Sequence, residues 1–431
     1  MNISIIGSGY VGLVSGACFA DLGNKVICID NDEAKIKKLK SGSIPIYEPG
    51  LKELVKRNMK EGRLTFSSKI KEGVKKCEVI FIAVGTPSKD NGDADLTFVE
   101  HVSREIAISM PAYRLIVEKS TVPVNTGEWV EQTIRIFNKR NIKFDVASNP
   151  EFLREGSAIE DFMHPDRIVI GVKSKKARDI LIELYKPLRI PVVVTDIKSA
   201  EIIKHASNSF LATKISFINA VADICDKVGA DIIEVAKGMG LDRRIGKEFL
   251  NAGAGFGGSC FPKDLSAFIR IADKVGCDFG ILKEVQKVND YQKRLVVKKI
   301  EDLLWNLSKK TIGVLGLSFK PNTDDIRQSP SLEIISTLQK EGSKIKAYDP
   351  EAMNKARKIL RQDVEFCKDA YSVARDSDCL VILTEWNEFK ELDFKKIKKL
   401  MKQPVIVDSR NIYGPTEIKK LGFRYAGIGR R

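Results

Sequence analysis

The chain has 431 residues, of which 43% are hydrophobic and 30% are charged. This composition is that of a folded globular protein and excludes a largely disordered or low-complexity chain. The formal net charge is +15, from 72 Lys and Arg against 57 Asp and Glu, which favours anionic ligands without identifying their kind. At about 150 residues a domain, the length predicts about three domains, or two large ones and a connector.

Membrane insertion and secretion are both disfavoured. No apolar stretch approaches the roughly 18 residues that a bilayer span requires, and the N-terminal segment runs from a short apolar stretch straight into a glycine turn, unlike a secretion signal. The eight cysteines are scattered and form no Cys-x-x-Cys pair. We therefore predict a reduced, cytoplasmic protein with no membrane contact, no metal site and no disulfide framework.

The first part of the chain alternates strand and helix patterns. Lys-rich amphipathic stretches such as Glu33–Lys40 and Gly50–Lys60 predict helices between short apolar runs. This alternation predicts a parallel sheet with helices on both faces, over residues 1–197. The predicted strands are Ile3–Ile6, Val26–Ile29, Val79–Val84, Leu115–Val117, Phe144–Ala147, Ile168–Val172 and Val192–Val194.

The middle of the chain has a different character. From Lys198 to about Val228 the sequence contains no Pro or Gly, and apolar residues recur at helical spacing on more than one side. Because such a long helix needs packing partners on each side, we predict a helical connector over residues 198–304 that also forms a dimer interface.

A second α/β domain is predicted over residues 305–431, where the strand and helix patterns return. Gly313 and Gly316, at the first strand of this part, resemble the glycines near the N-terminus. The predicted strands are Ile312–Leu315, Ile345–Tyr348, Leu380–Thr384 and Val405–Asp408.

A Gly-x-Gly-x-x-Gly motif, Gly7–Gly12, lies between the first strand and a helix, and the next strand ends at Asp30. In a dinucleotide site, Gly7 makes the tight turn, Gly9 lets the pyrophosphate approach the backbone, and Gly12 allows close packing of helix on strand. The alternative is an ordinary strand–turn–helix with no ligand.

The acidic residue at the end of the second strand selects between the two nicotinamide cofactors. Asp30 can accept hydrogen bonds from both ribose hydroxyls, and its charge repels a 2′-phosphate. We therefore predict NAD rather than NADP, although Lys35 close by weakens that exclusion.

The most glycine-rich segment, Gly253–Asp264, contains a candidate nucleophile, Cys260. Pro262 suits the first position of a helix, so Cys260 lies just ahead of a helix N-terminus, with Lys263 one turn on. Both features lower the pKa of a thiol and increase the thiolate population. The other seven cysteines are predicted to be small core residues.

Two further sets of polar residues could act on a substrate. Lys204 and Asn208 share one face of the long helix and could hold an oxyanion, but a polar stripe on a surface helix explains them equally well. Asn149 and Pro150 predict a helix start, which would place Glu151 beside the helix dipole. None of the three histidines is assigned a role, so any general base is predicted to be a carboxylate.

Together, these motifs resemble those of the UDP-glucose 6-dehydrogenases of the nucleotide-sugar dehydrogenase superfamily, in order and over nearly the whole length. The resemblance implies two Rossmann-like, doubly wound parallel-sheet domains joined by a long-helix connector. It also implies NAD-dependent oxidation of UDP-glucose to UDP-glucuronate, with two NAD⁺ reduced per sugar. The matching segments are Gly7–Gly12, Ala83–Pro87, Glu118–Pro123, Asn149–Glu155, Asp166–Gly171, Lys204 with Asn208, Gly255–Asp264 and Phe319–Arg327.

By this resemblance Cys260 is the nucleophile, which forms a thiohemiacetal and then a thioester. Lys204 and Asn208 stabilise the oxyanion, Asp264 and Thr121 support a water or base near the thiol, and Glu151 is the general base for hydrolysis. The predicted NAD-binding residues are Gly7, Gly9, Tyr10 and Gly12 of the glycine loop and, by resemblance, Val11, Asp30, Lys35, Thr86, Thr121, Glu155, Lys263 and Arg327.

The resemblance also implies the substrate-binding residues. Arg244 is expected to reach the substrate site of the neighbouring subunit, although the adjacent Arg243 makes that assignment ambiguous. The other predicted substrate contacts are Phe152, Leu153, Arg154, Glu155, Lys204, Asn208, Phe249, Leu250, Asn251, Ala252, Gly253, Gly257, Lys320 and Arg410.

Three alternatives remain. Sister enzymes act on UDP-N-acetylmannosamine or GDP-mannose, although Gly156–Ala158, Pro165–Arg167 and Gly257–Cys260 favour the UDP-glucose type. An ordinary two-electron NAD dehydrogenase would leave Cys260 inert. The positive charge also permits a nucleic-acid-binding protein, but the lysines are dispersed and no recognition motif is present, so we predict no nucleic-acid partner.

Overall fold

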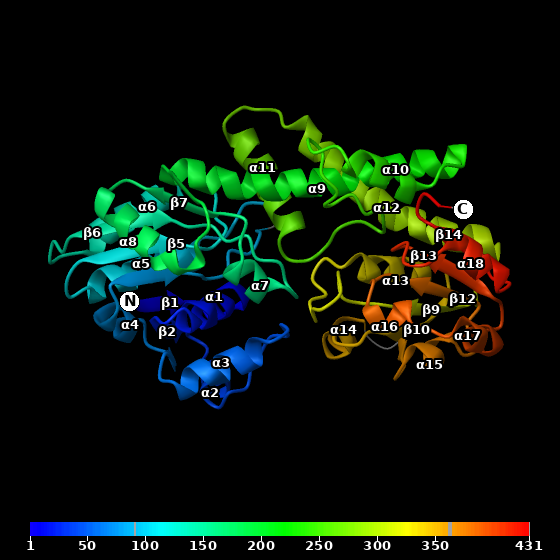
Figure 1. The fold of residues 1–431 in the computed structure, drawn as a ribbon, viewed down its shortest axis with the longest axis horizontal. Helices are drawn as coiled ribbons and strands as arrows, with labels where there is room; N and C mark the ends of the chain where they lie inside the picture. The colour runs from blue at the N-terminus through cyan, green and yellow to red at the C-terminus, as the bar shows by residue number, and fades with distance from the viewer. Residues whose placement is uncertain (90–91, 361–363, 431) are drawn as a thin grey trace. The chain divides into compact units, whose positions relative to one another are not determined.

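The structure is a computed structural model that describes residues 1–89, 92–360 and 364–430. It divides into two compact units, Met1–Ser207 with Ser266–Gly276 and Asn208–Leu265 with Cys277–Arg431 (Figure 1). The chain passes from one to the other within α9 (Ile197–Val228), which is one unbroken helix of 32 residues. The long helix predicted from Lys198 to about Val228 is therefore confirmed. The predicted boundaries of three domains stay a prediction.

In the described residues of the first unit, eight strands form one sheet, in the order β3-β2-β1-β4-β5-β6-β7-β8. All seven predicted strands are present, and the short edge strand β3 is additional. The strands are β1 (Asn2–Ile6), β2 (Lys25–Ile29), β3 (Leu64–Ser67), β4 (Val79–Ile82), β5 (Arg114–Glu118), β6 (Phe144–Ser148), β7 (Ile168–Val172) and β8 (Val192–Thr195).

The prediction that this whole sheet is parallel is wrong for one pair. β6 and β7 are antiparallel, with Ala147 opposite Val172, whereas the other neighbouring strands of this sheet are parallel. The connection between β6 and β7 contains α7 (Ala158–Met163), which packs against α1 (Tyr10–Asp21). The chain thus re-enters the sheet at the end where β6 leaves it, so the segment after β6 stays near that end.

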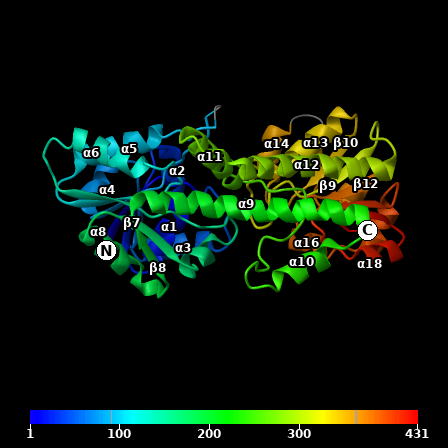
Figure 2. The same cartoon turned by 90° about the horizontal axis from the view of Figure 1, so that it is seen from above.

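Helices cover both faces of the first sheet (Figure 2). One core surrounds the fully buried Phe19, whose ring centroid lies 5.2 Å from that of Phe81 and 5.0 Å from that of Phe162. The opposite core contains Ile80 and Ile106. The first face carries α1, α2 (Glu33–Lys40), α3 (Leu51–Lys60), α7 and α8 (Lys175–Tyr185), and the second carries α4 (Ile70–Lys76), α5 (Thr97–Ser109) and α6 (Thr126–Phe137).

The described residues of the second unit place six strands in a parallel sheet, in the order β11-β10-β9-β12-β13-β14. The four predicted strands are confirmed, and β11 and β14 are short edge strands that were not predicted. The strands are β9 (Thr311–Leu315), β10 (Lys344–Tyr348), β11 (Val364–Phe366), β12 (Cys379–Ile382), β13 (Val405–Asp408) and β14 (Arg424–Gly427).

This second sheet is also covered on both faces, which confirms the doubly wound fold class. The C-terminal part of α9 packs on one face with α12 (Gly280–Leu304), α13 (Pro330–Lys340) and α14 (Met353–Ile359). The other face carries α15 (Ala370–Ala374), α16 (Asn387–Lys390), α17 (Phe394–Leu400) and α18 (Pro415–Lys420). The unit also contains α10 (Ile232–Gly240), and α11 spans Phe261–Lys274.

Two local predictions are corrected by the structure. No helix begins at Asn149, and α7 begins only at Ala158, because the Asn149 side chain bonds to other strand ends instead of capping a helix. Of the seven cysteines predicted to be core residues, six are buried, but Cys277 is exposed. In addition, α11 begins at Phe261, one residue ahead of the predicted start.

Two features of the described residues concern membrane insertion and metal binding. None of the helices in these residues combines the length and apolar character needed to span a bilayer. Within the same residues, no group of three or more His, Cys, Asp or Glu side chains is arranged to hold a metal ion.

Candidate active site

The strand order of the first sheet reverses between β1 and β4, where doubly wound folds form a ligand crevice. Gly7 has φ +103°, and a Cβ there would lie 2.3 Å from the Ala83 carbonyl oxygen. A Cβ on Gly12 would lie 1.8 Å from the Gly7 oxygen, so packing requires glycine at both positions. A Cβ on Gly9 would meet nothing within 4 Å, so packing does not explain this glycine.

The N-terminus of α1 beside Gly9 is suited to a pyrophosphate. Gly9 occupies the N-cap position without a side-chain cap, and no acidic residue lies in the first turn of the helix. Backbone N–H groups and the helix dipole favour an anion at such a terminus. The residues present therefore fit the diphosphate of NAD.

Asp30 lies directly after β2, as the sequence predicts, and its side chain is buried. Oδ2 accepts a hydrogen bond from the Ser8 backbone N–H at 2.9 Å and lies 2.8 Å from the Lys35 ammonium. The carboxylate therefore faces the glycine loop. Lys35 is ion-paired with the group that would bind the ribose, which is consistent with its predicted influence on the choice between NAD and NADP.

A buried carboxylate that sequence reasoning missed connects the glycine loop with the predicted substrate segment. Glu48 accepts hydrogen bonds from the Tyr10 hydroxyl, from the Gly156 N–H at 2.6 Å and from the Ala158 N–H at 2.8 Å. Burial and the Glu48 carboxylate raise the pKa of Tyr10 above its ordinary range. Because Glu48 is 38 residues from Tyr10 and 108 from Gly156, no local pattern could indicate these contacts.

The two predicted threonines lie together beside a pair of buried acids. The Thr86 hydroxyl donates to the Thr121 carbonyl at 2.8 Å. Burial raises the pKa of Glu118 to about 8 and that of Glu201 to about 7, and the two acids also interact electrostatically. Glu201 accepts from two N–H groups at the start of α6, those of Asn125 and Gly127, each at 2.8 Å.

Glu151 and Lys204 form a buried ion pair, with the lysine Nζ 3.1 Å from Oε1 of the glutamate. The other carboxylate oxygen accepts from the Leu153 N–H at 2.5 Å. The Phe152 ring lies between two cations, with its centroid 3.7 Å from the Arg167 guanidinium and 5.2 Å from Lys204 Nζ. The structure thus brings Glu151, Phe152 and Lys204 together, as the resemblance implies.

The rest of this segment lies on the surface or is half-buried. Arg154 is exposed and forms a 2.5 Å ion pair with Asp161. Leu153 and Glu155 are half-buried. The predicted NAD contacts fall mainly in this unit, whereas Lys263 and Arg327 belong to the second unit.

In the second unit, Cys260 lies directly ahead of α11 and is partly exposed. Its backbone carbonyl accepts from the Asp264 N–H at 2.8 Å. The buried Asp264 carboxylate accepts from Asn208 Nδ2 at 2.6 Å and lies 3.3 Å from Lys263 Nζ. The structure therefore joins two predicted catalytic residues, Asn208 and Asp264, and fixes the orientation of the Asn208 amide.

The glycines before Cys260 permit close packing on the loop that follows β9. A Cβ on Gly257 would lie 2.2 Å from the Gln328 carbonyl oxygen. Gly258 has φ +84°, donates its N–H to the Arg327 carbonyl at 3.0 Å, and leaves no room for a side chain beside the Phe319 ring. The Arg327 guanidinium bonds to Asp325 at 2.6 Å.

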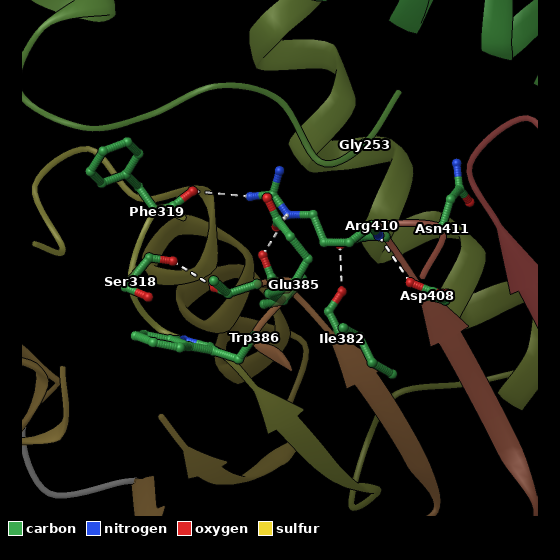
Figure 3. Close-up of polar contacts among 12 residues, drawn as sticks. Gly253, Ser318, Phe319, Ile382, Glu385, Trp386, Asp408, Arg410 and Asn411 are labelled. Atoms are coloured by element: carbon green, nitrogen blue, oxygen red, sulfur yellow. Dashed lines mark hydrogen bonds and ion pairs between the residues drawn. The ribbon is translucent and has the colours of Figure 1, made fainter. Parts of the chain in front are cut away.

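Arg410 follows β13, at the carboxyl end of the strands of the second sheet (Figure 3). Its Nε donates to the Leu383 carbonyl at 2.8 Å and lies 3.3 Å from Oε2 of Glu385, while Nη2 donates to the Phe319 carbonyl at 3.3 Å. A Cβ on Gly253 would lie 3.5 Å from Nη1 of the same arginine.

Three of the predicted substrate residues of this unit, Ala252, Gly253 and Lys320, therefore lie near Arg410. Lys320 adjoins Phe319, and the Ala252 carbonyl accepts from Asn411 Nδ2 at 3.5 Å. Leu250 and Gly257 are buried and Asn251 is exposed. Phe249 has φ +64°, and its ring lies 6.1 Å from that of Phe261. Arg244 is exposed and bonds to Asp242 at 2.7 Å.

The two sheets differ at the acidic residue that follows the second strand. Asp349 follows β10 as Asp30 follows β2, but it is fully buried. Its Oδ2 accepts from the backbone N–H groups of Leu317 and Ser318, the Ser318 hydroxyl and Trp386 Nε1, at 2.7 to 3.1 Å. Groups of the protein thus already bond to Oδ2 of Asp349, whereas in a dinucleotide site the carboxylate at this position accepts hydrogen bonds from the ribose.

These features define a dinucleotide-dependent enzyme with a second nucleotide-binding-type sheet, and comparison with known proteins identifies its family. Models of the UDP-glucose/GDP-mannose dehydrogenase family match residues 1–189 as the NAD binding domain, 198–291 as the central domain and 313–415 as the UDP binding domain.

Individual proteins of this family match over the whole chain. The UDP-glucose 6-dehydrogenase TuaD of Bacillus subtilis is 51% identical over 100% of this chain and 93% of its own length. The structure of a UDP-glucose dehydrogenase from Pyrobaculum islandicum superposes with a TM-score of 0.94 at 40% identity, covering 100% and 98% of the two chains. A UDP-D-ManNAc dehydrogenase from Pyrococcus horikoshii gives 0.89 at 28% identity, covering 100% and 99%.

The chain belongs to the UDP-glucose/GDP-mannose dehydrogenase family. It is an NAD-dependent oxidoreductase.

The position of Asp30 predicts a change in cofactor preference. In Asp30→Asn the ribose loses a charged acceptor and Lys35 is released to meet a 2′-phosphate. We expect the ratio of kcat/KM for NAD⁺ to that for NADP⁺ to fall about tenfold or more. The measurement is initial-rate kinetics with both cofactors. Asp32→Asn, at the exposed cap of α2, serves as the control, and an unchanged ratio in Asp30→Asn would contradict the assignment.

Proposed function

We propose that this protein oxidises UDP-glucose to UDP-glucuronate and holds the sugar covalently on Cys260 between two oxidations. The observation that supports this most directly is a partly exposed thiol at the start of α11, followed one turn later by a buried carboxylate that orients Asn208. The full-length identity to a relative named UDP-glucose 6-dehydrogenase supports the choice of substrate.

The proposed chemistry passes through two adducts of the sugar on sulfur. When bound, NAD⁺ accepts the hydride that each oxidation removes from C6. After the first oxidation, the Cys260 thiolate adds to the aldehyde carbon, and the carbonyl electron pair moves to oxygen as an alkoxide. After the second, the adduct is a thioester. Water attacks its carbonyl carbon, the C–S bond breaks, and the thiolate is recovered with the product acid.

Lys204 and Asn208 are the proposed donors to the alkoxide. Both lie on α9, one helical turn apart. Preorganised donors of this kind typically contribute on the order of 10²–10³ in rate. Asp264 keeps the Asn208 amide directed through the 2.6 Å bond.

Glu151 is the proposed general base for thioester hydrolysis. Its carboxylate is buried, and the Leu153 N–H and the Lys204 ammonium fix its orientation. A general base has to be held within hydrogen-bond reach of the proton that it removes. The rigid placement of Glu151 is consistent with such a role.

We further propose that the first unit binds NAD⁺ through the glycine loop and Asp30, with Thr86, Thr121 and Glu155. The second unit takes the UDP group through Lys320, Arg410 and residues 249–253. Because protein donors already occupy the Asp349 carboxylate, the second sheet does not offer a ribose the acceptor that Asp30 offers. This difference supports one dinucleotide site and one site of another kind.

The sister activity on UDP-N-acetylmannosamine is the alternative. The P. horikoshii enzyme has the same fold at 28% identity, so the fold does not discriminate between the two sugars. Identity of 51% across the whole chain favours UDP-glucose. Relative kcat/KM values for the two UDP-sugars distinguish these activities directly.

A homodimer built on α9 is the proposed assembly. Phe210, Phe217 and Ile224 follow one another at seven-residue spacing, and their side chains are 65%, 53% and 57% exposed. Residues at this spacing share one helix face, and an exposed apolar stripe of this size marks an interaction surface. Arg244, also exposed, is the proposed residue that reaches the partner's substrate site.

We propose a reduced compartment, the cytoplasm, for this enzyme. Every cysteine in the chain is free, and six of the eight are buried without forming disulfides. The proposed reaction also requires the Cys260 thiol to stay reduced.

Replacing the nucleophile tests the covalent route. Cys260→Ala is expected to form no UDP-glucuronate because no sulfur can hold the aldehyde. Cys260→Ser is expected to accumulate an oxygen ester, because the hydroxyl adds to the aldehyde but is a poorer leaving group. Intact-protein mass spectrometry after incubation with UDP-glucose and NAD⁺ detects that adduct. The control is Cys277→Ser, which changes an exposed thiol. Full acid formation by Cys260→Ala would disprove the covalent route.

Introducing charge into the exposed stripe tests the assembly. Phe217→Glu is expected to shift the protein from dimer to monomer because two buried carboxylates would face each other across a symmetric interface. Sedimentation equilibrium gives the mass directly. The matched change Phe98→Glu, at a 49% exposed phenylalanine on α5, should leave the mass unchanged. A wild-type monomer at micromolar concentration would rule out the dimer.

A further inference from the structure

Lys119, directly after β5, is a buried cation. Its side chain is 4% exposed, and Nζ donates to Oδ1 of Asn149 at 3.1 Å and to the Asn149 carbonyl at 3.4 Å. Within the part of the chain that the structure describes, no carboxylate lies within ion-pair distance of this ammonium. Burying a charge against neutral partners is costly, so packing alone does not account for a lysine here.

Anchoring Asn149 does not account for it either. The Asn149 side chain has two further partners, the Tyr185 hydroxyl, which donates to Oδ1 at 2.5 Å, and the Val169 carbonyl, which accepts from Nδ2 at 2.8 Å. These bonds tie the end of β6 to β7 and α8 without Lys119. The charge of Lys119 is therefore the property to be explained.

Lys119 Nζ lies 3.4 Å from the carbonyl oxygen of Asn149, two residues before Glu151, which places its charge near the Glu151–Lys204 pair. Burial lowers the pKa of Lys119 to about 8, the Glu151 carboxylate opposes this fall, and the Lys204 ammonium adds to it. Below pH 8 Lys119 therefore adds a positive charge beside the pair, near the place where the oxyanion forms in the proposed reaction.

Two acids lie near this cluster, and burial reduces their negative charge at neutral pH without abolishing it, since the pKa of Glu201 is about 7. Tyr185 lies behind Asn149, and burial raises its pKa above the ordinary range. Glu118 precedes Lys119, and Glu201 interacts with it; burial raises the pKa of both acids. Arg167, whose guanidinium lies 3.7 Å from the centroid of the Phe152 ring, is a further cation.

We propose that Lys119 is a positioning residue that offsets the Glu151 carboxylate and so leaves the Lys204 ammonium available to the substrate oxyanion. Without Lys119, Lys204 would be the cation that balances the Glu151 carboxylate. The substrate oxyanion would then compete with Glu151 for the Lys204 ammonium. Lys119 acts through these two residues and does not touch the substrate. The inference rests on the proposed function.

The test is Lys119→Met, which keeps the length of the side chain and removes the charge. We expect kcat to fall about tenfold at pH 7, as for a lost electrostatic contribution, with little change in KM for UDP-glucose. Because Lys119 is charged only below its pKa of about 8, the ratio of wild-type to variant kcat should decline towards 1 as the pH rises past 9. The thermal midpoint should stay equal or rise, since a buried charge is removed.

Three companion variants keep this test decisive. Lys119→Gln is a second neutral side chain and should reproduce the pH-dependent ratio. Lys119→Arg keeps a charge that does not titrate in this range, so the ratio of its kcat to that of Lys119→Met should not decline as the pH rises past 9. Lys173→Met removes an exposed lysine of the same unit that pairs with Glu131 and should match the wild type throughout.

The outcomes separate the two proposals. A ratio that is the same at every pH, or neutral variants that both lose thermal stability, would assign Lys119 a purely structural role and overturn the inference. Acid formation by Cys260→Ala would overturn the proposed function whatever the ratio. If the Cys260 variants behave as expected and the ratio is flat, only the role of Lys119 fails.

Discussion

The ion pair between Lys204 and Glu151 is the interaction on which the proposed chemistry of the first unit depends. Its atoms lie 3.1 Å apart, and both side chains are buried. Removing two charges from water is costly, and their attraction compensates only in good geometry. Because this buried pair is stable only in good geometry, it holds both side chains in a fixed position. The proposed reaction uses one member to stabilise an alkoxide and the other to activate water, so the pair serves both halves of the oxidation.

The two sheets differ in a way that supports the two ligands proposed for them. Each places a glycine with φ near +100° after its first strand, Gly7 in one and Gly316 in the other, and an aspartate after its second. Asp30 keeps its carboxylate at the glycine loop with a lysine beside it, whereas Asp349 is fully buried and satisfied by protein donors. The backbone repeats, but the side chains at the crevice decide which nucleotide fits.

Patterns that are local in the sequence predicted most of the fold. The glycine loop, the long helix and eleven strands could be predicted because each depends on neighbouring residues: apolar runs, turn glycines and a stretch without Gly or Pro. The edge strands β3, β11 and β14 are only three or four residues long and carry too little pattern. The antiparallel β7 depends on where the chain re-enters the sheet, which local sequence does not determine.

In the candidate site, too, local sequence did not predict contacts between residues that are distant in the chain. Asn149 looked like a helix cap because Pro150 follows it, but its partners Lys119, Val169 and Tyr185 are 20 to 36 residues away. Glu48 lies in no motif, and Lys119 lies in the matched segment Glu118–Pro123 without an assigned role. The structure singles both out because of their contacts with distant segments. Cys277 resembles the core cysteines in its local sequence, and only the tertiary structure shows that it is exposed.

In the proposed reaction, one thiol carries the sugar through two successive oxidations. The most direct measurement is the number of NADH molecules formed per UDP-glucose consumed, from absorbance at the nicotinamide band and chromatography of the sugar nucleotides in the same reaction. The account predicts two NADH per UDP-glucose, with UDP-glucuronate as the only sugar product. A ratio of one, with a free aldehyde in solution, would contradict it.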